Sequence, residues 1–125
     1  MKLVSFADFQ KMALQFPETV ELPHFDRTSF RVKGKIFATY DFANNRAMVK
    51  LSLLDQSVFS AFDKTIIYPV PGGWGKNGAT YFELKKIKKP MLRDALTTAW
   101  LNVAPPSLRS LYRIKKMITN KRVNI

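Results

Sequence analysis

The chain has 125 residues, of which 46% are hydrophobic and 13% aromatic, and its formal net charge is +12. The aromatic content excludes an intrinsically disordered chain, and the absence of cysteine excludes disulfides, Cys-ligated zinc and thiol catalysis. The charge is uneven, because residues 1–62 hold 8 Lys or Arg against 6 Asp or Glu while residues 63–125 hold 13 against 3. A surface of this sign attracts polyanions, which include nucleic acid, anionic membrane and acidic proteins.

The first 17 residues predict a helix. Ser5 and Asp8 have the spacing of a capping box. Phe9, Met12 and Phe16 then fall on one helical face, and Pro17 ends the run. The segment carries no apolar stretch of signal-peptide length, and no window of the chain approaches the length of a membrane span. We therefore expect a soluble, cytoplasmic monomer without integral membrane association.

Residues 20–52 predict antiparallel strands joined by hairpins. Short segments rich in Val, Ile, Phe, Thr and Tyr are broken at Pro23, at Lys33-Gly34 and at Asn44-Asn45. Pairing across Lys33-Gly34 divides the central hairpin into two faces. The predicted core face holds Phe30, Val32 and Phe37, and the other face holds Arg31, Ile36, Ala38 and Tyr40.

The second half predicts three helices and two strands. Ser52 and Asp55 repeat the capping pattern before a helix whose predicted sheet-facing residues are Leu54, Val58, Ala61 and Phe62. Residues 66–68 and 80–85 read as strands on either side of a glycine-rich, wing-like loop at 71–78. Pro90 opens the next helix, with the apolar stripe Leu92, Leu96, Ala99 and Val103, and Pro105-Pro106 ends it. Ser107 caps a last helix whose predicted inward residues are Leu108, Leu111, Ile114 and Ile118.

This order of elements predicts an α+β fold, with an antiparallel β-sheet packed against α-helices in a single domain. The expected domain covers residues 1–118, and residues 119–125 form a basic tail that we expect to be flexible.

Basic residues gather in two places. Arg109, Arg113 and Lys116 share one side of the last predicted helix, where they could follow phosphates. Residues 85–89 hold four lysines at the junction of a strand and a helix. A solvated surface that keeps the protein soluble explains both clusters as well.

Trp74 is expected to anchor the glycine-rich loop by packing, although the loop could also present it to a base or a minor groove. The loop matches neither a Walker motif nor a dinucleotide fingerprint.

Catalysis and metal binding find little support. The single histidine, His24, has no partner at a metal-ligand spacing, the acidic residues are few and dispersed, and no serine lies in a nucleophile elbow. We expect no enzyme activity, no cofactor and no metal site.

Several motifs, in this order and spacing, resemble the MmcQ/YjbR family of small bacterial proteins. They are Phe16-Pro17 with Glu21 and Pro23-His24-Phe25, the stretch from Phe30 to Ala38, Lys50-Leu51, Trp74-Gly75 with Gly78, and Trp100 to Pro105. The resemblance implies a CyaY-like fold with hairpins of the double-wing type and a DNA-binding role, and it implies no enzyme activity or cofactor. Two features depart from the family pattern, namely Gly72-Gly73 and the lysines after Leu84. The implied frataxin-like shape also suggests iron binding as a function, but Asp8, Glu18 and Glu21 offer too few hard oxygen ligands for an iron site.

The sequence therefore predicts a non-catalytic nucleic-acid-binding protein, with double-stranded DNA favoured over RNA, that binds mainly through phosphates with weak sequence readout. The predicted contact residues are Arg31, Lys33, Lys35, Lys76, Lys85, Lys88, Arg109, Arg113 and Lys116. The alternative is a protein-interaction module whose basic surface docks an acidic partner. Peripheral membrane binding is a weaker option, because the sequence shows no amphipathic helix with a clear insertion face.

Overall fold

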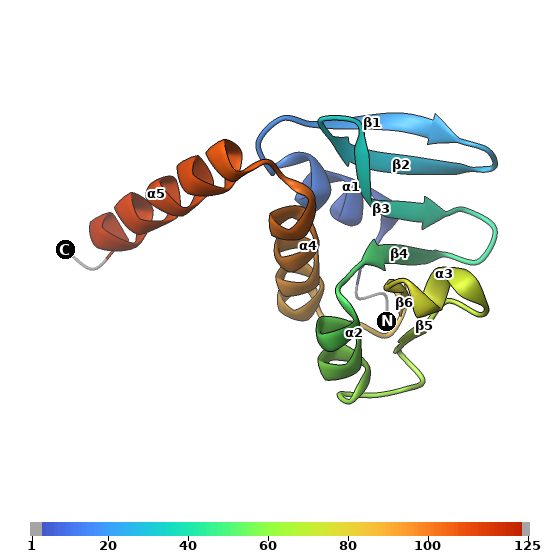
Figure 1. Ribbon diagram of the computed structural model, residues 1–125. Coiled ribbons are helices and arrows are strands. Elements are labelled where there is room, and N and C mark those ends of the chain that lie inside the picture. Colours follow the sequence, from blue (N-terminus) through green and yellow to red (C-terminus); the bar gives the residue numbers. More distant parts are fainter. Residues whose placement is uncertain (1–3, 124–125) are drawn as a thin grey trace.

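A six-stranded antiparallel sheet organises the molecule (Figure 1). The computed structural model describes residues 4–123, with side chains through residue 119. The strands lie in the spatial order β1-β2-β3-β4-β6-β5. Their bounds are β1 Thr19–His24, β2 Arg27–Val32, β3 Lys35–Asp41, β4 Arg46–Lys50, β5 Ile67–Pro69 and β6 Ala79–Glu83. The prediction of a single α+β domain with an antiparallel sheet is confirmed.

Five helices accompany the sheet within residues 4–123. Their bounds are α1 Phe6–Leu14, α2 Leu53–Ser60, α3 Gly73–Lys76, α4 Lys89–Val103 and α5 Pro106–Val123. The predicted cap Ser107 is wrong, because α5 already begins at Pro106, and α3 lies where a loop was predicted. In contrast, α1 and α2 start at their predicted caps. At α1 the Asp8 amide donates to the Ser5 hydroxyl over 3.0 Å, and the Ser5 amide donates to the Asp8 carboxylate over 3.1 Å. Ser52 caps α2 in the same way through the Asp55 amide. Local sequence signals therefore placed these helix starts correctly.

The core lies between one face of the sheet and the helices α1, α4 and part of α2. Trp100 of α4 is fully buried, and its Nε1 donates to the Pro17 carbonyl over 3.2 Å. Phe9 of α1 meets Phe30 of β2 edge to face, and Phe59 of α2 packs against Phe82 of β6. These aromatic contacts fix the helices on the same side of the sheet.

The predicted facing of the central hairpin is wrong for two residues. Phe30, Val32 and Phe37 are fully buried as predicted, but Ala38 and Tyr40 are buried on the core side as well. The pairing register between β2 and β3 shifts by one residue between Phe30 and Arg31. This β-bulge lets the consecutive residues Phe37 and Ala38 both enter the core.

The predicted strand break at Pro23 is also wrong. β1 runs through Pro23, and the chain turns at Phe25-Asp26 instead. Because β1 is an edge strand, a residue without a backbone N–H can lie on its unpaired side without loss of a ladder hydrogen bond.

The predicted inward face of α2 points to solvent. Leu54, Val58 and Phe62 are 60% exposed or more, and Ala61 is exposed too. The buried residues of α2 are Gln56 and Ser60, and the Gln56 amide donates to the Gly75 and Ala79 carbonyls and to the Thr80 hydroxyl. The polar side of α2 is therefore buried because Gln56 hydrogen-bonds to backbone groups of the chain that follows the helix.

The predicted inward face of α5 is mostly exposed as well. After Pro105-Pro106 the helix leaves the domain and projects from it (Figure 1). Leu108 and Tyr112 pack against the core, whereas Leu111, Ile114 and Ile118 are exposed. The helix continues to Val123, beyond the boundary predicted at residue 118, and the last two residues of the predicted tail lie outside the described residues. No helix within residues 4–123 is long and apolar enough to cross a membrane.

Candidate nucleic-acid interface

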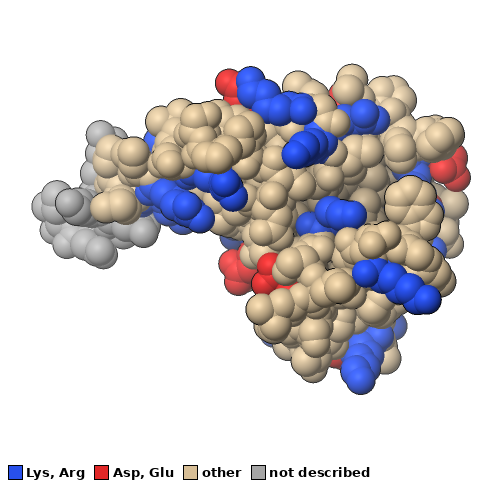
Figure 2. Space-filling view, in the orientation of Figure 1, with Lys and Arg blue, Asp and Glu red and all other residues tan. Residues whose placement is uncertain are grey.

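The projecting helix α5 carries the basic ridge that the sequence predicts. At 3.6 residues per turn, Arg109, Arg113 and Lys116 fall within an arc of about 60°. Leu108 and Tyr112 face the domain, and the exposed apolar residues lie on a third side. Figure 2 shows Lys and Arg side chains along this helix. The ridge is therefore a row of three cations on one side of a helix that packs on the domain through Leu108 and Tyr112 and then projects from it (Figure 1).

A groove of about 400 Å³ lies at the base of this ridge, between α1, α4 and α5. We call it the α4–α5 groove. It is lined by Met12, Gln15, Phe16, Pro17, Arg93, Thr97, Tyr112, Lys115, Lys116 and Thr119. Three of these ten residues are cationic and none is acidic. Such a groove concentrates positive potential and favours an anion.

Arg93 extends this positive surface toward the lysine cluster that precedes α4. Lys89 and Arg93 are one helical turn apart on α4, so their side chains are neighbours. Lys89 Nζ lies 3.6 Å from Asp8 Oδ2 at the start of α1. The pKa of Asp8 is lowered, first by its hydrogen bonds from Ser5 and further by Lys89. Lys89 thus lies one helical turn from the groove residue Arg93 and is paired with Asp8 of α1.

The remaining predicted contact residues lie elsewhere. Lys33 and Lys35 flank the β2–β3 turn, and Lys33 pairs with Glu18 over 3.2 Å. Arg31 lies on the sheet, where its Nε donates to the Ser29 hydroxyl over 2.9 Å, and Lys76 ends α3. Lys85 and Lys88 are exposed between β6 and α4. On the face shown in Figure 2 the basic side chains form separate groups with uncharged surface between them. The structure therefore unites the predicted set only in part.

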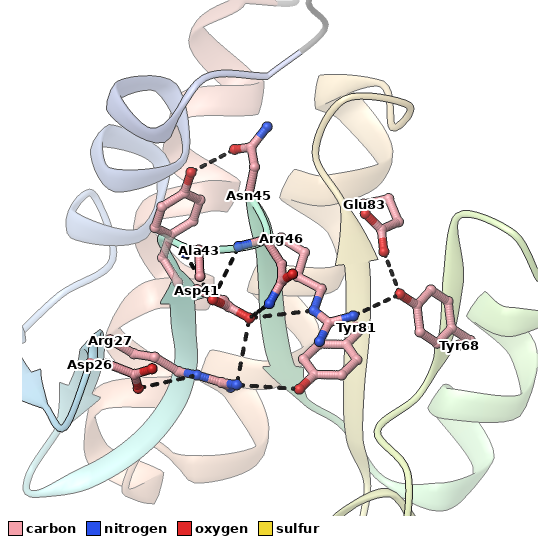
Figure 3. Close-up of polar contacts among 11 residues, drawn as sticks. Asp26, Arg27, Asp41, Ala43, Asn45, Arg46, Tyr68, Tyr81 and Glu83 are labelled. Carbon is pink, nitrogen blue, oxygen red and sulfur yellow. Dashed lines mark hydrogen bonds and ion pairs between the residues drawn. The ribbon is translucent and has the colours of Figure 1, made fainter.

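A second polar constellation lies on the face of the sheet turned away from the core, which we call the open face (Figure 3). Asp41 of β3 is buried, and its Oδ2 lies 3.5 Å from Arg27 Nη2 and 3.5 Å from Arg46 Nε. The Arg46 guanidinium lies 3.8 Å from the centre of the Tyr81 ring and donates to the Tyr68 hydroxyl over 3.2 Å. These contacts link five neighbouring strands across the sheet.

The protonation states of this network follow from burial and from its own charges. Burial alone would raise the pKa of Asp41, but hydrogen bonds from Asn44 and the charges of Arg27 and Arg46 outweigh it and lower that pKa. Burial raises the pKa of Tyr68, and its hydrogen bond to the Glu83 carboxylate raises it further. At neutral pH the network therefore holds an ionised Asp41 between two arginines, an arrangement that stabilises the sheet.

The open face also holds a groove of about 450 Å³, which we call the sheet-face groove. It is lined by His24, Phe25, Asp26, Arg27, Thr39, Met48, Val70, Trp74 and Ala79. Trp74 is 75% exposed, so the prediction that it anchors the loop by packing is wrong. Residues 73–76 form the short helix α3 instead of an open wing, and Gly75 rather than Trp74 is buried.

Sequence reasoning missed three residues of these surfaces. Arg93 had a signal in its spacing of four from Lys89, whereas Lys115 does not share the helix side of Arg109 and Arg113 and so falls outside the predicted ridge. Phe25 belongs to one of the motifs that carry the family resemblance, and no neighbouring residue in the sequence indicates that its side chain is 95% exposed. Each residue acquires its role from a partner distant in sequence.

Within residues 4–119, no group of three or more His, Asp or Glu side chains lies close enough to hold a metal ion. No family model matches the chain, and no curated protein matches it. The resemblance to the MmcQ/YjbR family therefore stays a prediction.

Proposed function

We propose that this protein is a non-catalytic nucleic-acid-binding module that holds phosphates on the α4–α5 groove and the basic ridge of α5. The observation that carries the proposal is the lining of the groove, where Arg93, Lys115 and Lys116 converge without any carboxylate among the ten lining residues. Among the described side chains, no carboxylate lies within 4.0 Å of these three cations. Their charge is therefore available to a polyanion.

Double-stranded DNA is the proposed ligand of this surface. An 18-residue helix is about 27 Å long and can lie along a groove or a backbone of the duplex. Arginine and lysine on the ridge can neutralise phosphates, which gives affinity with little sequence readout. We also propose that the protein is bacterial and cytoplasmic and is of the MmcQ/YjbR type. The order of the sequence motifs supports the family.

The salt dependence of DNA binding tests the proposal. We expect duplex binding, followed by fluorescence anisotropy, to weaken with salt along a log–log slope steeper than about −5 if six or more phosphates are neutralised. Replacing Arg113, Lys115 and Lys116 with glutamine should flatten this slope by up to about 3 and weaken binding on the order of a hundredfold at about 0.15 M salt.

The matched control is the triple variant Lys33→Gln, Lys35→Gln and Lys64→Gln. It also removes three positive charges, but from residues outside α4 and α5. We expect the control to keep a slope close to that of the wild type. Equal losses in the two triple variants would show that only net charge matters, and an absence of duplex binding at low salt would remove the proposal.

A second candidate function is docking of an acidic protein. The exposed apolar side of α5 favours it, because Leu111, Ile114 and Ile118 lie on the same helix as the basic ridge and are 43% exposed or more. An acidic amphipathic partner could bury these residues while it pairs with the cations. Ile114→Ser would weaken such a complex and leave DNA binding unchanged, which separates the two functions.

A further inference from the structure

We propose that the sheet-face groove binds an unpaired nucleobase of a single-stranded nucleic acid between Phe25 and Trp74. The inference rests on the proposed function in taking nucleic acid as the ligand, but it assigns a separate site on the opposite side of the sheet from the α4–α5 groove.

The exposure of the two rings has no explanation in packing. Phe25 is 95% exposed, and among the described side chains the only aromatic ring that it contacts is that of its neighbour His24, at 4.9 Å between centroids. Its φ of 59° lies in the left-handed region, which glycine adopts at lower energy than a large side chain. Glycine would remove this strain and the apolar exposure at once. A strained and exposed phenylalanine at a groove is therefore a sign of a ligand contact.

Phe25 and Trp74 line the same groove on the open face of the sheet. Thr39, Met48 and Ala79 contribute to its lining from three neighbouring strands, and Phe25 and Trp74 come from the β1–β2 turn and from α3. A volume of about 450 Å³ accommodates a planar ring with its sugar. Stacking on an aromatic side chain is the usual way in which proteins hold unpaired bases.

The polar groups of the groove match the edge of a base. The Asp26 side chain is 82% exposed and can accept hydrogen bonds from an exocyclic amine or a ring N–H. His24 and Arg27 lie in the same lining. Arg27 is already paired with Asp41, but a lipid tail or an aliphatic side chain would cover Asp26 and His24 without offering them a hydrogen bond, so an apolar ligand fits less well.

The charge around the groove favours a ligand with phosphates. Lys76 follows Trp74 by two residues on α3, and Lys50 pairs in the sheet with Ala79 of the groove. Neither lysine has a carboxylate within 4.0 Å among the described side chains. Duplex DNA cannot use this site, because the faces of its bases are covered by stacking. The ligand is therefore a single strand.

Tryptophan fluorescence provides the test. The chain has two tryptophans, and Trp100 is fully buried while Trp74 is exposed. We expect oligothymidylate to quench the emission of Trp74. Trp74→Ala should weaken single-strand binding about tenfold without a change in its salt slope, since stacking neutralises no phosphate. Duplex binding should stay at the wild-type level.

Phe25→Gly separates a ligand contact from a structural role. We expect it to weaken single-strand binding while raising the urea midpoint of unfolding, because the strained φ suits glycine. Leu54→Ala, which removes an apolar side chain outside the groove that is 75% exposed, should change neither quantity.

Three results would overturn the inference. Unchanged single-strand affinity in Trp74→Ala with intact duplex binding would refute the groove and leave the proposed function in place. Quenching by thymidine monophosphate at the affinity of the oligonucleotide would make the ligand a free nucleotide. Absence of binding to strand and duplex at low salt would remove both proposals.

Discussion

Gly78→Ala is expected to lower the free energy of unfolding by about 3 kcal/mol or more. A Cβ atom at this position would lie 1.8 Å from the Leu51 carbonyl oxygen, and the φ of Gly78 is +105°, where other residues are strained. The backbone cannot move away easily, because the Leu51 amide donates to the Gly78 carbonyl over 2.9 Å. Urea unfolding followed by the fluorescence of buried Trp100 measures the loss.

Gly73→Ala is the matched control on the same loop. No atom lies within 4 Å of a Cβ at Gly73, and its φ is not in the left-handed region. Because the residue belongs to α3, alanine should be neutral or stabilise by up to about 1 kcal/mol. Similar midpoints for the two variants would contradict the close packing of this loop, which positions Trp74 and Lys76 beside the sheet.

Asp41→Ala is expected to cost about 3 kcal/mol, because it leaves Arg27 and Arg46 without their shared counter-charge on the sheet. The effect should depend on pH. The pKa of Asp41 is lower in the folded protein than its ordinary value of 3.8, so its ionisation stabilises the fold above that value. This contribution is lost as the pH falls through the folded pKa.

The comparison of wild type with Asp41→Asn isolates the titration. The difference in unfolding free energy should be greatest above about pH 5 and should shrink as the pH falls below about 4. Asp94→Asn serves as a control, since Asp94 is exposed on α4 and has no ion pair among the described side chains. A difference that does not change with pH would contradict the charged state assigned to Asp41.

Local signals in the sequence were sufficient for most helix and strand positions. Ser5 with Asp8, Ser52 with Asp55 and Pro90 mark helix starts through backbone groups within three residues, so no distant contact can change them. The strands follow from β-branched and aromatic runs between turn residues.

The facing of side chains depended on contacts that sequence patterns do not contain. The bulge at Phe37 and Ala38 changes the alternation of β3 by one residue. Gln56 buries the polar side of α2 because it meets the Gly75 and Ala79 carbonyls, more than 18 residues away. The apolar stripe of α5 has the periodicity of a core helix, but Pro105-Pro106 directs the helix away from the domain.

For the candidate site too, the sequence predicted the features that depend on local spacing and missed those that depend on distant contacts. The ridge of Arg109, Arg113 and Lys116 follows from helical spacing alone, and its cations lie on one helix face. The α4–α5 groove required Arg93 of α4 and Lys115 of α5 to come together, and the sheet-face groove required Phe25 and Trp74, which are distant in sequence, to line the same groove on one face of the sheet. Net charge indicated a polyanion and could not indicate where it binds.

The most direct test of binding at the α4–α5 groove is the change in backbone amide chemical shifts of the ¹⁵N-labelled protein when duplex DNA is added at low salt. We predict that the largest changes fall on residues 93–97 of α4 and residues 109–116 of α5, and that they disappear at high salt. An absence of shifts at low salt, or largest shifts at Lys33 and Lys35 on the β2–β3 turn, would contradict it.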